Sequence, residues 1–456
     1  MSRLLASVRF AALMLVVQTA LAQAPAWVEK VDAAVAARLA QPGAVGFSVA
    51  VAQDGAVLLE KGYGRAECEF DVPANAATSF RIGSITKQFT AALVMRAVAA
   101  GKVALDDDLS KFVPEFPLQG KKVTIHRLLD HSSGIPSYTD VGPEWQKQWP
   151  LELTHEQLLA LVAGKPFDFE PGTDWHYNNT GYYLLGMVLE KVHGKSYAEV
   201  VQDEIATPLG LSRTRYDSNK DLIPNRAQGY DVVGGKLAND DLLGMNQPGA
   251  AGGLIASAGD LVRWSMALAG GKVVSKEAYA QMTTPLVLPG GRDTGYGFGL
   301  MRGEVLGMPA IQHGGGIHGF NSMLMFFPER ALHVAVISNC DRASSDKLAK
   351  GIARAVLGVP EFVAKDLPVP AELRTACAGD YDFKDVGLVL SITVDGEKLR
   401  GQGKADGQQP FAMLFQGGRE FRAAFDHEVR LVFGEDGKAL VLHQGGGVFT
   451  GRRVGD

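Results

Sequence analysis

Two apolar hairpin patterns that lie far apart in the chain constrain its fold more than any other feature of the sequence. The first covers residues 46–60 around an Asp54–Gly55 turn, which is the strongest short-range hairpin signal. The second covers residues 323–338 around a turn at residues 328–330. The segment between them carries mostly helical patterns. We therefore predict an α+β fold, in which an antiparallel sheet built from both ends of this region is flanked by helices and by an inserted helical region.

A change of composition divides the chain into two parts. Residues 362–373 contain Pro368 and Pro370 and are predicted to form a linker. Beyond the linker, short strand patterns alternate with glycine-containing turns, which indicates a small all-β, barrel-like domain over residues 374–456. The main domain is predicted to cover residues 23–361.

Residues 1–22 have the features of a secretory signal peptide. Two arginines supply the positive charge, residues 10–17 the apolar core, and residues 20–22 a small-residue cleavage site. We therefore predict cleavage near Ala22 and a secreted or periplasmic protein. The apolar core is shorter than the roughly 20 residues of a membrane span, so an uncleaved membrane helix is the weaker alternative and no stable membrane anchor is expected.

Charge and metal-ligand content exclude several classes of protein. The 456 residues have a net charge of −5 and no basic run, so nucleic-acid binding is not expected. The three cysteines are widely separated and form neither a disulfide framework nor a zinc motif. The histidines include no His-Glu-x-x-His, so we expect no catalytic metal and no cofactor. Nothing in the sequence indicates an oligomeric state.

A candidate nucleophile lies at the start of a long helical pattern. Ser84 and Lys87 fall in the first turn of a largely apolar helix that continues to Ala100. Residues three apart share a helical face, and a neutral lysine amine can accept the proton of a serine hydroxyl. Burial and the helix dipole both lower a lysine pKa, which is the direction that this role requires.

The same spacing also has a purely structural interpretation, in which the serine caps a helix and the lysine is solvated. Ser-x-x-Lys occurs a second time at Ser344 and Lys347, within a polar run. We interpret that second copy as a solvated helix start. Only the rest of the site can distinguish the two copies.

A loop that contains Tyr177 and Asn179 can complete such a site. It follows a Pro171–Gly172 turn, and Asn179 together with Thr180 is predicted to cap the next helix. The phenol can carry a proton between Ser84 and a leaving group, and the amide can hold a substrate carbonyl. Taken alone, such a loop is more often an ordinary packed aromatic followed by a helix cap.

A glycine-rich stretch, residues 313–320, comes just before the second hairpin. Its glycines allow a substrate to lie against a strand edge and leave a backbone N–H free for an oxyanion. The letters also contain Gly-x-Gly-x-x-Gly, but a strand pattern follows where a dinucleotide site needs a helix, so we exclude that interpretation. Taken alone, a glycine-rich turn with His313 as a polar rim residue is the commoner structure.

In this order, the three elements resemble the serine β-lactamase and penicillin-binding-protein superfamily, most closely its class C β-lactamase, D-aminopeptidase, DD-carboxypeptidase and esterase branch. The resemblance covers roughly residues 45–357, and His131 within it is assigned to turn structure. The segment after Pro370 resembles the lipocalin-like β domain often appended to such hydrolases. Further stretches look like family scaffold: Leu128–Pro136, Pro248–Leu254, Gly295–Gly299 and Phe327–Glu329.

The resemblance implies a role for each candidate residue. Ser84 becomes acylated, and Lys87 and Tyr177 manage its proton. Asn179 positions the acyl amide, and the backbone N–H groups of Ser84 and Gly316 form the oxyanion hole.

The resemblance also implies that His313, Gly315 and Gly316 bind substrate. His313 stands where many β-lactamases carry a lysine that grips the substrate carboxylate. A histidine is a weaker anchor for an anion near neutral pH, which argues against efficient β-lactam hydrolysis.

We therefore expect an exported serine hydrolase that cleaves small amides or esters, D-amino-acid peptides foremost, through an acyl-enzyme on Ser84. Its partner is a small-molecule or short-peptide substrate. A class C-like β-lactamase is the alternative within the family. An alternative from another class is a penicillin or peptidoglycan sensor whose acyl-enzyme does not turn over.

Overall fold

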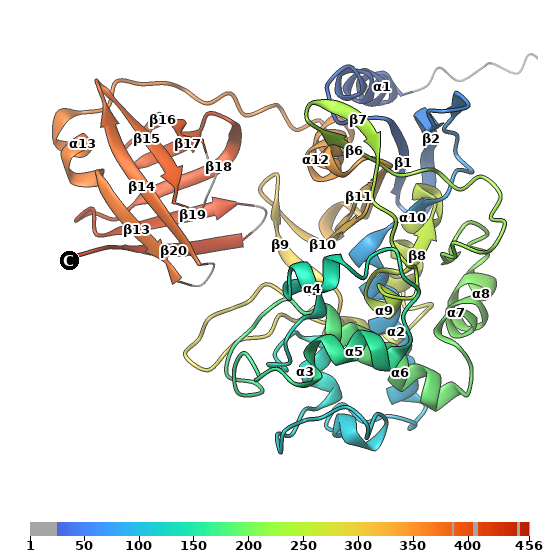
Figure 1. Cartoon of the computed structure of the whole chain (residues 1–456). Coiled ribbons are helices and arrows are strands. Elements are labelled where there is room, and N and C mark those ends of the chain that lie inside the picture. The colour runs from blue at the N-terminus through green and yellow to red at the C-terminus, as the bar shows by residue number, and fades with distance from the viewer. Residues whose placement is uncertain (1–24, 385–386, 405–408, 445–446, 456) are drawn as a thin grey trace, which may run out of the picture.

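The computed structural model describes residues 25–384, 387–404, 409–444 and 447–455. The predicted signal peptide, residues 1–22, lies outside them. Two bodies make up the chain, a main domain and a β-barrel that a long segment joins to it (Figure 1). Within the described part of the chain, none of the helices combines the length and the apolar character that a bilayer span requires.

The main domain is organised around a seven-stranded sheet with the order β3-β2-β1-β12-β11-β10-β9. The early hairpin is β1 with β2, and the late hairpin is β11 with β12. β1 pairs with β12 in antiparallel register, with Phe47 opposite Ser338, so strands from opposite ends of the region meet at the centre. The predicted antiparallel sheet is confirmed. The strands are β1 (Gly46–Gln53), β2 (Ala56–Glu67), β3 (Val72–Pro73), β9 (Met301–Val305), β10 (Met308–Ile317), β11 (Phe320–Phe327) and β12 (Leu332–Ser338).

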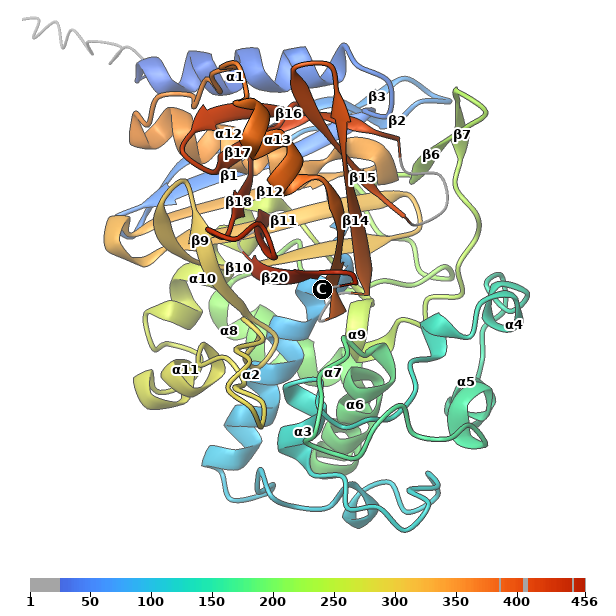
Figure 2. The same ribbon diagram turned by 90° about the vertical axis from the view of Figure 1, so that its left-hand side faces the viewer.

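The sheet has a hydrophobic core on each face, because successive side chains of a strand point to opposite sides. Phe47, Val49 and Val51 of β1 belong to the core that contains α1 and α12, whereas Ala50 and Ala52 belong to the core that contains α2 and α10. Figure 2 shows α1 and α12 on one side of the sheet and α2 and α10 on the other. These helices are α1 (Ala26–Leu39), α2 (Thr86–Ala99), α10 (Ala258–Ala269) and α12 (Ser345–Leu357).

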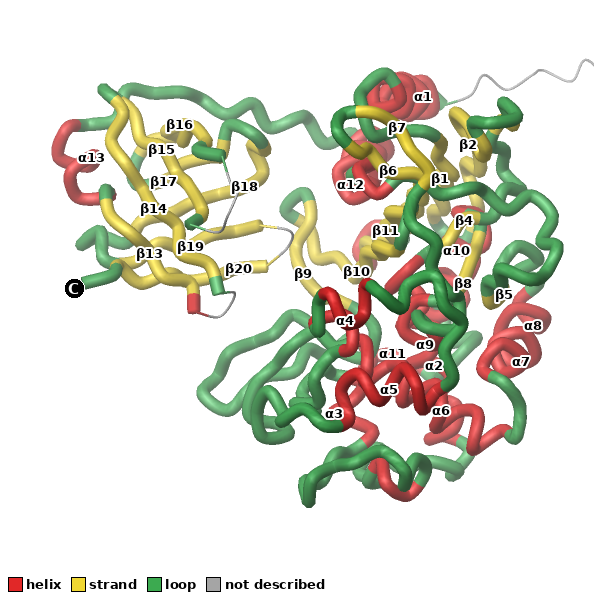
Figure 3. Tube along the Cα trace, in the orientation of Figure 1, coloured by secondary structure: helices red, strands yellow, loops and turns green. Residues whose placement is uncertain are grey.

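The inserted helical region lies to one side of the sheet, where the helices gather (Figure 3). α2 is at its centre and is buried on nearly all sides, as expected for a largely apolar helix without a separate polar face. The ring of Phe89 on α2 stacks on that of Trp264 on α10, with their centroids 3.9 Å apart. The other helices are α3 (Ile125–Leu129), α4 (Pro143–Gln146), α5 (His155–Ala163), α6 (Asn179–His193), α7 (Tyr197–Val201), α8 (Thr207–Leu209), α9 (Gly249–Gly252) and α11 (Lys276–Met282).

The C-terminal part is a closed barrel of eight strands, which confirms the predicted small all-β domain. Inward-facing side chains alternate with exposed ones along its strands and form a separate core. A short helix, α13 (Ala371–Cys377), lies across the predicted end of the linker at residue 373. The strands are β13 (Gly379–Phe383), β14 (Leu388–Asp395), β15 (Lys398–Gly403), β16 (Phe411–Gly417), β17 (Glu420–Ala423), β18 (Asp426–Phe433), β19 (Ala439–Gln444) and β20 (Gly447–Arg453).

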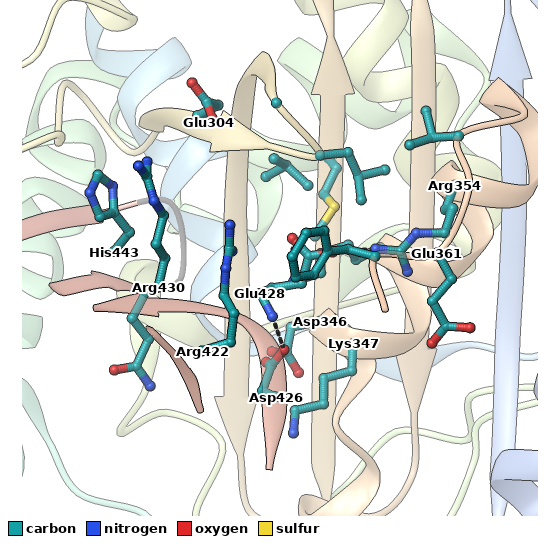
Figure 4. Close-up of a pocket in the computed structure, with 18 of the residues that line it drawn as sticks. Glu304, Asp346, Lys347, Arg354, Glu361, Arg422, Asp426, Glu428, Arg430 and His443 are labelled. Carbon is teal, nitrogen blue, oxygen red and sulfur yellow. Dashed lines mark hydrogen bonds and ion pairs between the residues drawn. The ribbon is translucent and has the colours of Figure 1, made fainter. Parts of the chain in front are cut away.

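A cavity of about 880 Å³ lies between the barrel and the main domain (Figure 4). Arg354 of α12 forms an ion pair with Glu428 of β18, and Lys350 Nζ lies 4.0 Å from the same carboxylate. None of the predicted site residues lines this cavity.

The segment before Ser84 is held by a small sheet of three short strands, with the order β4-β8-β5. The Ile82 N–H donates to the carbonyl of Leu254, 3.0 Å away. Asp217 is buried and accepts hydrogen bonds from Arg81 Nε at 2.7 Å and from Arg226 at 3.0 Å. These bonds connect the nucleophile segment to the helical region. The strands are β4 (Phe80–Arg81), β5 (Arg215–Tyr216) and β8 (Leu254–Ala256).

We predict that Asp217→Ala destabilises the main domain by about 3 kcal/mol, because it leaves two guanidinium groups without their buried partner. Urea unfolding followed by tryptophan fluorescence measures this. Asp221→Ala is the matched control, since its ion pair with Arg215 is exposed and worth less than about 1 kcal/mol. Equal losses in the two variants would contradict the prediction.

Candidate active site

Ser84 lies in a short 3-10 turn, Gly83–Ile85, that runs directly into α2. Its side chain caps neither element. Lys87 is in the first turn of α2 and is completely buried. The second Ser-x-x-Lys copy differs, since Ser344 precedes α12 and Lys347 is exposed. Burial of the lysine therefore separates the two copies.

The amine of Lys87 makes three polar contacts. Its Nζ lies 3.0 Å from Ser84 Oγ, 2.8 Å from Asn179 Oδ1 and 2.9 Å from the carbonyl oxygen of Ala251. Burial lowers the pKa of this amine well below its ordinary value. No carboxylate pairs with it among the described residues. The geometry thus places a neutral amine beside the serine hydroxyl.

Tyr177 also lies close to this amine, with Lys87 Nζ 4.7 Å from the centre of its ring. Burial raises the pKa of the Tyr177 phenol, and interaction with Ser84 partly offsets that rise. The hydroxyl accepts and donates no hydrogen bond of good geometry within the described ranges. Tyr177 is therefore a protonated phenol next to the serine.

Asn179 is the first residue of α6, and the predicted helix cap is corrected here. The cap is Asn178, whose side chain accepts from the Gly181 N–H at 2.7 Å. Asn179 is thereby free for the site, where its Oδ1 accepts from Lys87 and its Nδ2 donates to Thr139 Oγ1 at 3.1 Å. The sequence pattern placed the cap at Asn179, although Asn178 suits a cap position equally well.

Residues 313–317 of the glycine-rich stretch belong to strand β10, and only residues 318–319 form a turn, which leads into β11. The β10 part packs against the nucleophile segment. A Cβ on Gly315 would collide with the Ile82 carbonyl oxygen and the Ser322 hydroxyl. Ser322 Oγ donates to that carbonyl at 2.8 Å. Gly83 adopts a positive φ of 50° and lies against the backbone of Gly316. The backbone of Gly316 therefore reaches the neighbourhood of Ser84.

His313 also lies on β10, but its imidazole is buried and engaged. Its Nδ1 donates to the carbonyl of Gly314 at 2.6 Å, so Nε2 accepts from the Tyr296 hydroxyl at 2.9 Å. Burial is the chief cause that lowers the pKa of His313 to about 4. The imidazole is neutral and is not a rim residue as the structural alternative supposed.

His131 is buried as well and supports the tyrosine loop. Its Nδ1 accepts from the Asn178 N–H at 3.0 Å. Its ring packs against those of Tyr177, Tyr182 and Tyr296, with centroids 4.5, 5.1 and 4.6 Å away. This placement agrees with the structural role that the sequence suggested.

A cavity of about 670 Å³ opens beside the nucleophile. Ser84, Asn179 and Gly316 line it, whereas Tyr177 and His313 do not. Among the described residues, no group of histidine, cysteine, aspartate and glutamate side chains is arranged to hold a metal ion.

Sequence reasoning missed three contributors to the site. Tyr296 and Ala251 belong to stretches that stood out only as scaffold, although glycines around Tyr296 and after Ala251 mark close backbone packing. Thr139, which orients the Asn179 amide, carries no signal of its own.

A buried lysine beside a serine, with a phenol, an amide and a glycine strand around them, defines a serine hydrolase. The family model described as Beta-lactamase matches residues 31–357. The chain therefore belongs to the beta-lactamase family, in the group that includes penicillin-binding proteins.

Individual relatives are distant but cover much of the chain. It is 28% identical over 386 residues to the D-aminopeptidase of Gluconobacter oxydans (strain 621H), which covers 81% of this chain and 70% of the relative. The octameric penicillin-binding protein homologue from Pyrococcus abyssi superposes with a TM-score of 0.66 at 27% identity, covering 93% of this chain and 99% of that one. A D-stereospecific amidohydrolase from Streptomyces sp. superposes with a TM-score of 0.62 at 29% identity, covering 74% and 100%.

We predict that Gly315→Ala lowers kcat/KM at least tenfold, on the order of 1.4 kcal/mol, because the new methyl group separates β10 from Ile82. Steady-state hydrolysis of a p-nitrophenyl ester measures the loss. Gly314→Ala is the control, since its Cβ would meet no atom closer than 3.6 Å. The two variants should differ clearly, and equal activity would refute the close approach.

A second prediction concerns Lys87 and pH. An amine with a lowered pKa binds fewer protons in the folded state than in the unfolded state, so its contribution to stability rises with pH up to its ordinary pKa of about 10.4. The free energy of unfolding of the native chain, minus that of Lys87→Met, should therefore rise between neutral pH and about pH 10. Denaturant titrations at several pH values measure this difference. Lys347→Met, at the exposed lysine of the second Ser-x-x-Lys copy, is the matched control. Equal slopes for the two variants would contradict the prediction.

Proposed function

We propose that this chain is an exported serine hydrolase that cleaves small amides or esters through an acyl-enzyme on Ser84, with D-amino-acid peptides and amides as the favoured substrates. The observation that carries the proposal is the 3.0 Å approach of Ser84 Oγ to a buried amine without a charged partner among the described residues. The signal-like residues 1–22 support export.

The contacts of Lys87 suggest how the hydroxyl is activated. A neutral amine has two hydrogens and one lone pair. Asn179 Oδ1 and the carbonyl of Ala251 can accept both hydrogens, which leaves the lone pair for the proton of Ser84. Lys87 then acts as the general base while Ser84 Oγ attacks the substrate carbonyl carbon.

The remaining steps use groups next to this pair. The backbone N–H groups of Ser84 and Gly316 stabilise the oxyanion of the tetrahedral intermediate. The proton passes from Lys87 through the Tyr177 phenol to the leaving amine or alcohol, and the carbon–leaving-group bond breaks. Water, activated by the same base, then releases the acyl group and restores Ser84.

Two observations favour amides of amino acids over β-lactams. The neutral His313, hydrogen-bonded to Tyr296, supplies no positive charge for a substrate carboxylate. The D-aminopeptidase of Gluconobacter oxydans and the D-stereospecific amidohydrolase of Streptomyces sp. are among the proteins that this chain resembles.

The test begins with covalent labelling by an uncharged fluorophosphonate. We predict that Ser84→Ala abolishes labelling and that Tyr177→Phe lowers the labelling rate about a hundredfold, the lower range for general acid–base groups. Ser344→Ala, in the second Ser-x-x-Lys copy, is the control and should label like the native chain. Labelling that survives Ser84→Ala would overturn the proposal.

Turnover of D-alanine amide, L-alanine amide and nitrocefin then identifies the reaction. The D-amide should be the best substrate. Faster turnover of nitrocefin would establish the β-lactamase alternative, and stoichiometric acylation without release would establish a sensor.

A further inference from the structure

The cavity beside Ser84 has an acidic far wall that the proposed chemistry does not use. Among the residues that the structure describes, four aspartates line it, at positions 231, 240, 241 and 341, and Arg342 is the single lysine or arginine that does so. They come from three places in the sequence: strand β6 (Tyr230–Val233), the segment after strand β7 (Lys236–Asn239), and the turn after β12. A fold that gathers them next to a nucleophile gives the cavity a negative end.

Internal pairing accounts for only part of this charge. Arg342 Nε donates to Asp231 Oδ1 at 3.1 Å, which satisfies that carboxylate. Asp240 accepts from the Asp241 N–H through Oδ1, but its Oδ2 is buried and accepts no hydrogen bond from the described residues. The pKa of the neighbouring Asp341 is raised to about 7, because its carboxylate loses hydration and is repelled by those of Asp240 and Asp231.

Other charged groups nearby do not relieve this repulsion. Arg81 is bound to Asp217 and lies over the ring of Phe320. The imidazole of His318 has a lowered pKa, chiefly through burial, and packs edge-on against Trp149 with centroids 4.3 Å apart. Among the described residues, no cluster of three or more histidine, cysteine, aspartate or glutamate side chains could hold a metal ion here. Two adjacent carboxylates that are partly shielded from water favour a shared proton or an added cation.

We propose that this acidic wall, chiefly Asp240 and Asp341, selects substrates that carry an ammonium or guanidinium group. The inference rests on the proposed function and extends it from the reacting bond to the rest of the substrate. A substrate cation that reaches the wall replaces the shared proton and forms charge-assisted hydrogen bonds with both carboxylates. The rings of Trp145 and Trp149, which line the same cavity, add an aromatic surface that suits a cation.

The wall also acts against anions. A substrate carboxylate at this end of the cavity meets Asp240, Asp241 and Asp341, and like charges in a partly desolvated site repel strongly. Selection for a cation and rejection of an anion therefore have the same origin. The preference should weaken with added salt, because the outer carboxylates are open to solvent.

The experiment compares three p-nitrophenyl esters of similar shape, with 6-aminohexanoyl, heptanoyl and adipoyl acyl groups, which place a cation, a neutral methyl or an anion at the chain end. A second trio places the same charges on the leaving group of an alanine anilide, so that both sides of the reacting bond are sampled. In at least one trio, kcat/KM for the cation should exceed that for the neutral compound by about tenfold, as expected for a charged hydrogen bond. The anion should be the poorest substrate.

The variants decide whether the wall causes the preference. Asp240→Asn and Asp341→Asn should each reduce the ratio of cation to neutral, mainly through KM, and leave hydrolysis of the neutral ester nearly unchanged. Asp54→Asn, at the exposed β1–β2 turn, is the control and should keep the native ratio. No charge preference in either trio, or a preference that survives both wall variants, would overturn this inference.

Failure of the proposed function gives a different result. Hydrolysis of all six compounds would then survive Ser84→Ala. If instead Ser84→Ala abolishes hydrolysis and the charge series is flat, the serine hydrolase stands and only the acidic wall is refuted.

Discussion

The buried amine of Lys87 is the constraint on which the rest of the site depends. An amine is charged in neutral water, and burial penalises the charged form. The amine contacts two carbonyl acceptors, from Asn179 and Ala251, and the hydroxyl of Ser84. No carboxylate of the described residues pairs with it. The fold can therefore activate a serine without an acidic partner, provided that α2 stays buried on nearly all sides.

That burial requires segments far apart in the chain to approach one another closely. β10 lies against the turn that holds Ser84, and Gly83 and Gly315 occupy positions where a side chain would collide with backbone. The opposite end of the cavity is set by different segments, which bring together Asp240 and Asp341. The nucleophile end is thus tightly packed and electrically neutral, whereas the far end is acidic, so reaction and selection are physically separate.

Much of the fold follows from local patterns. The Asp54–Gly55 turn and the apolar alternation around it predict a hairpin, and the run of helix formers after Ser84 predicts α2, because turn chemistry and periodicity act over a few residues. The same reasoning failed where two neighbours were chemically equivalent. It assigned the helix cap to Asn179 rather than Asn178, because helix propensity does not locate the start of a helix to within one residue.

The sequence by itself determined the candidate nucleophile, its lysine and the order of the elements that surround them. It also supplied the resemblance that linked Tyr177 and His313 to the same site. Only the tertiary structure decided which Ser-x-x-Lys copy is buried, that His313 is neutral and bound to Tyr296, and that aspartates from three segments share one cavity wall. The physical reason is that burial and electrostatic coupling depend on distances through space, which packing sets and spacing along the chain does not.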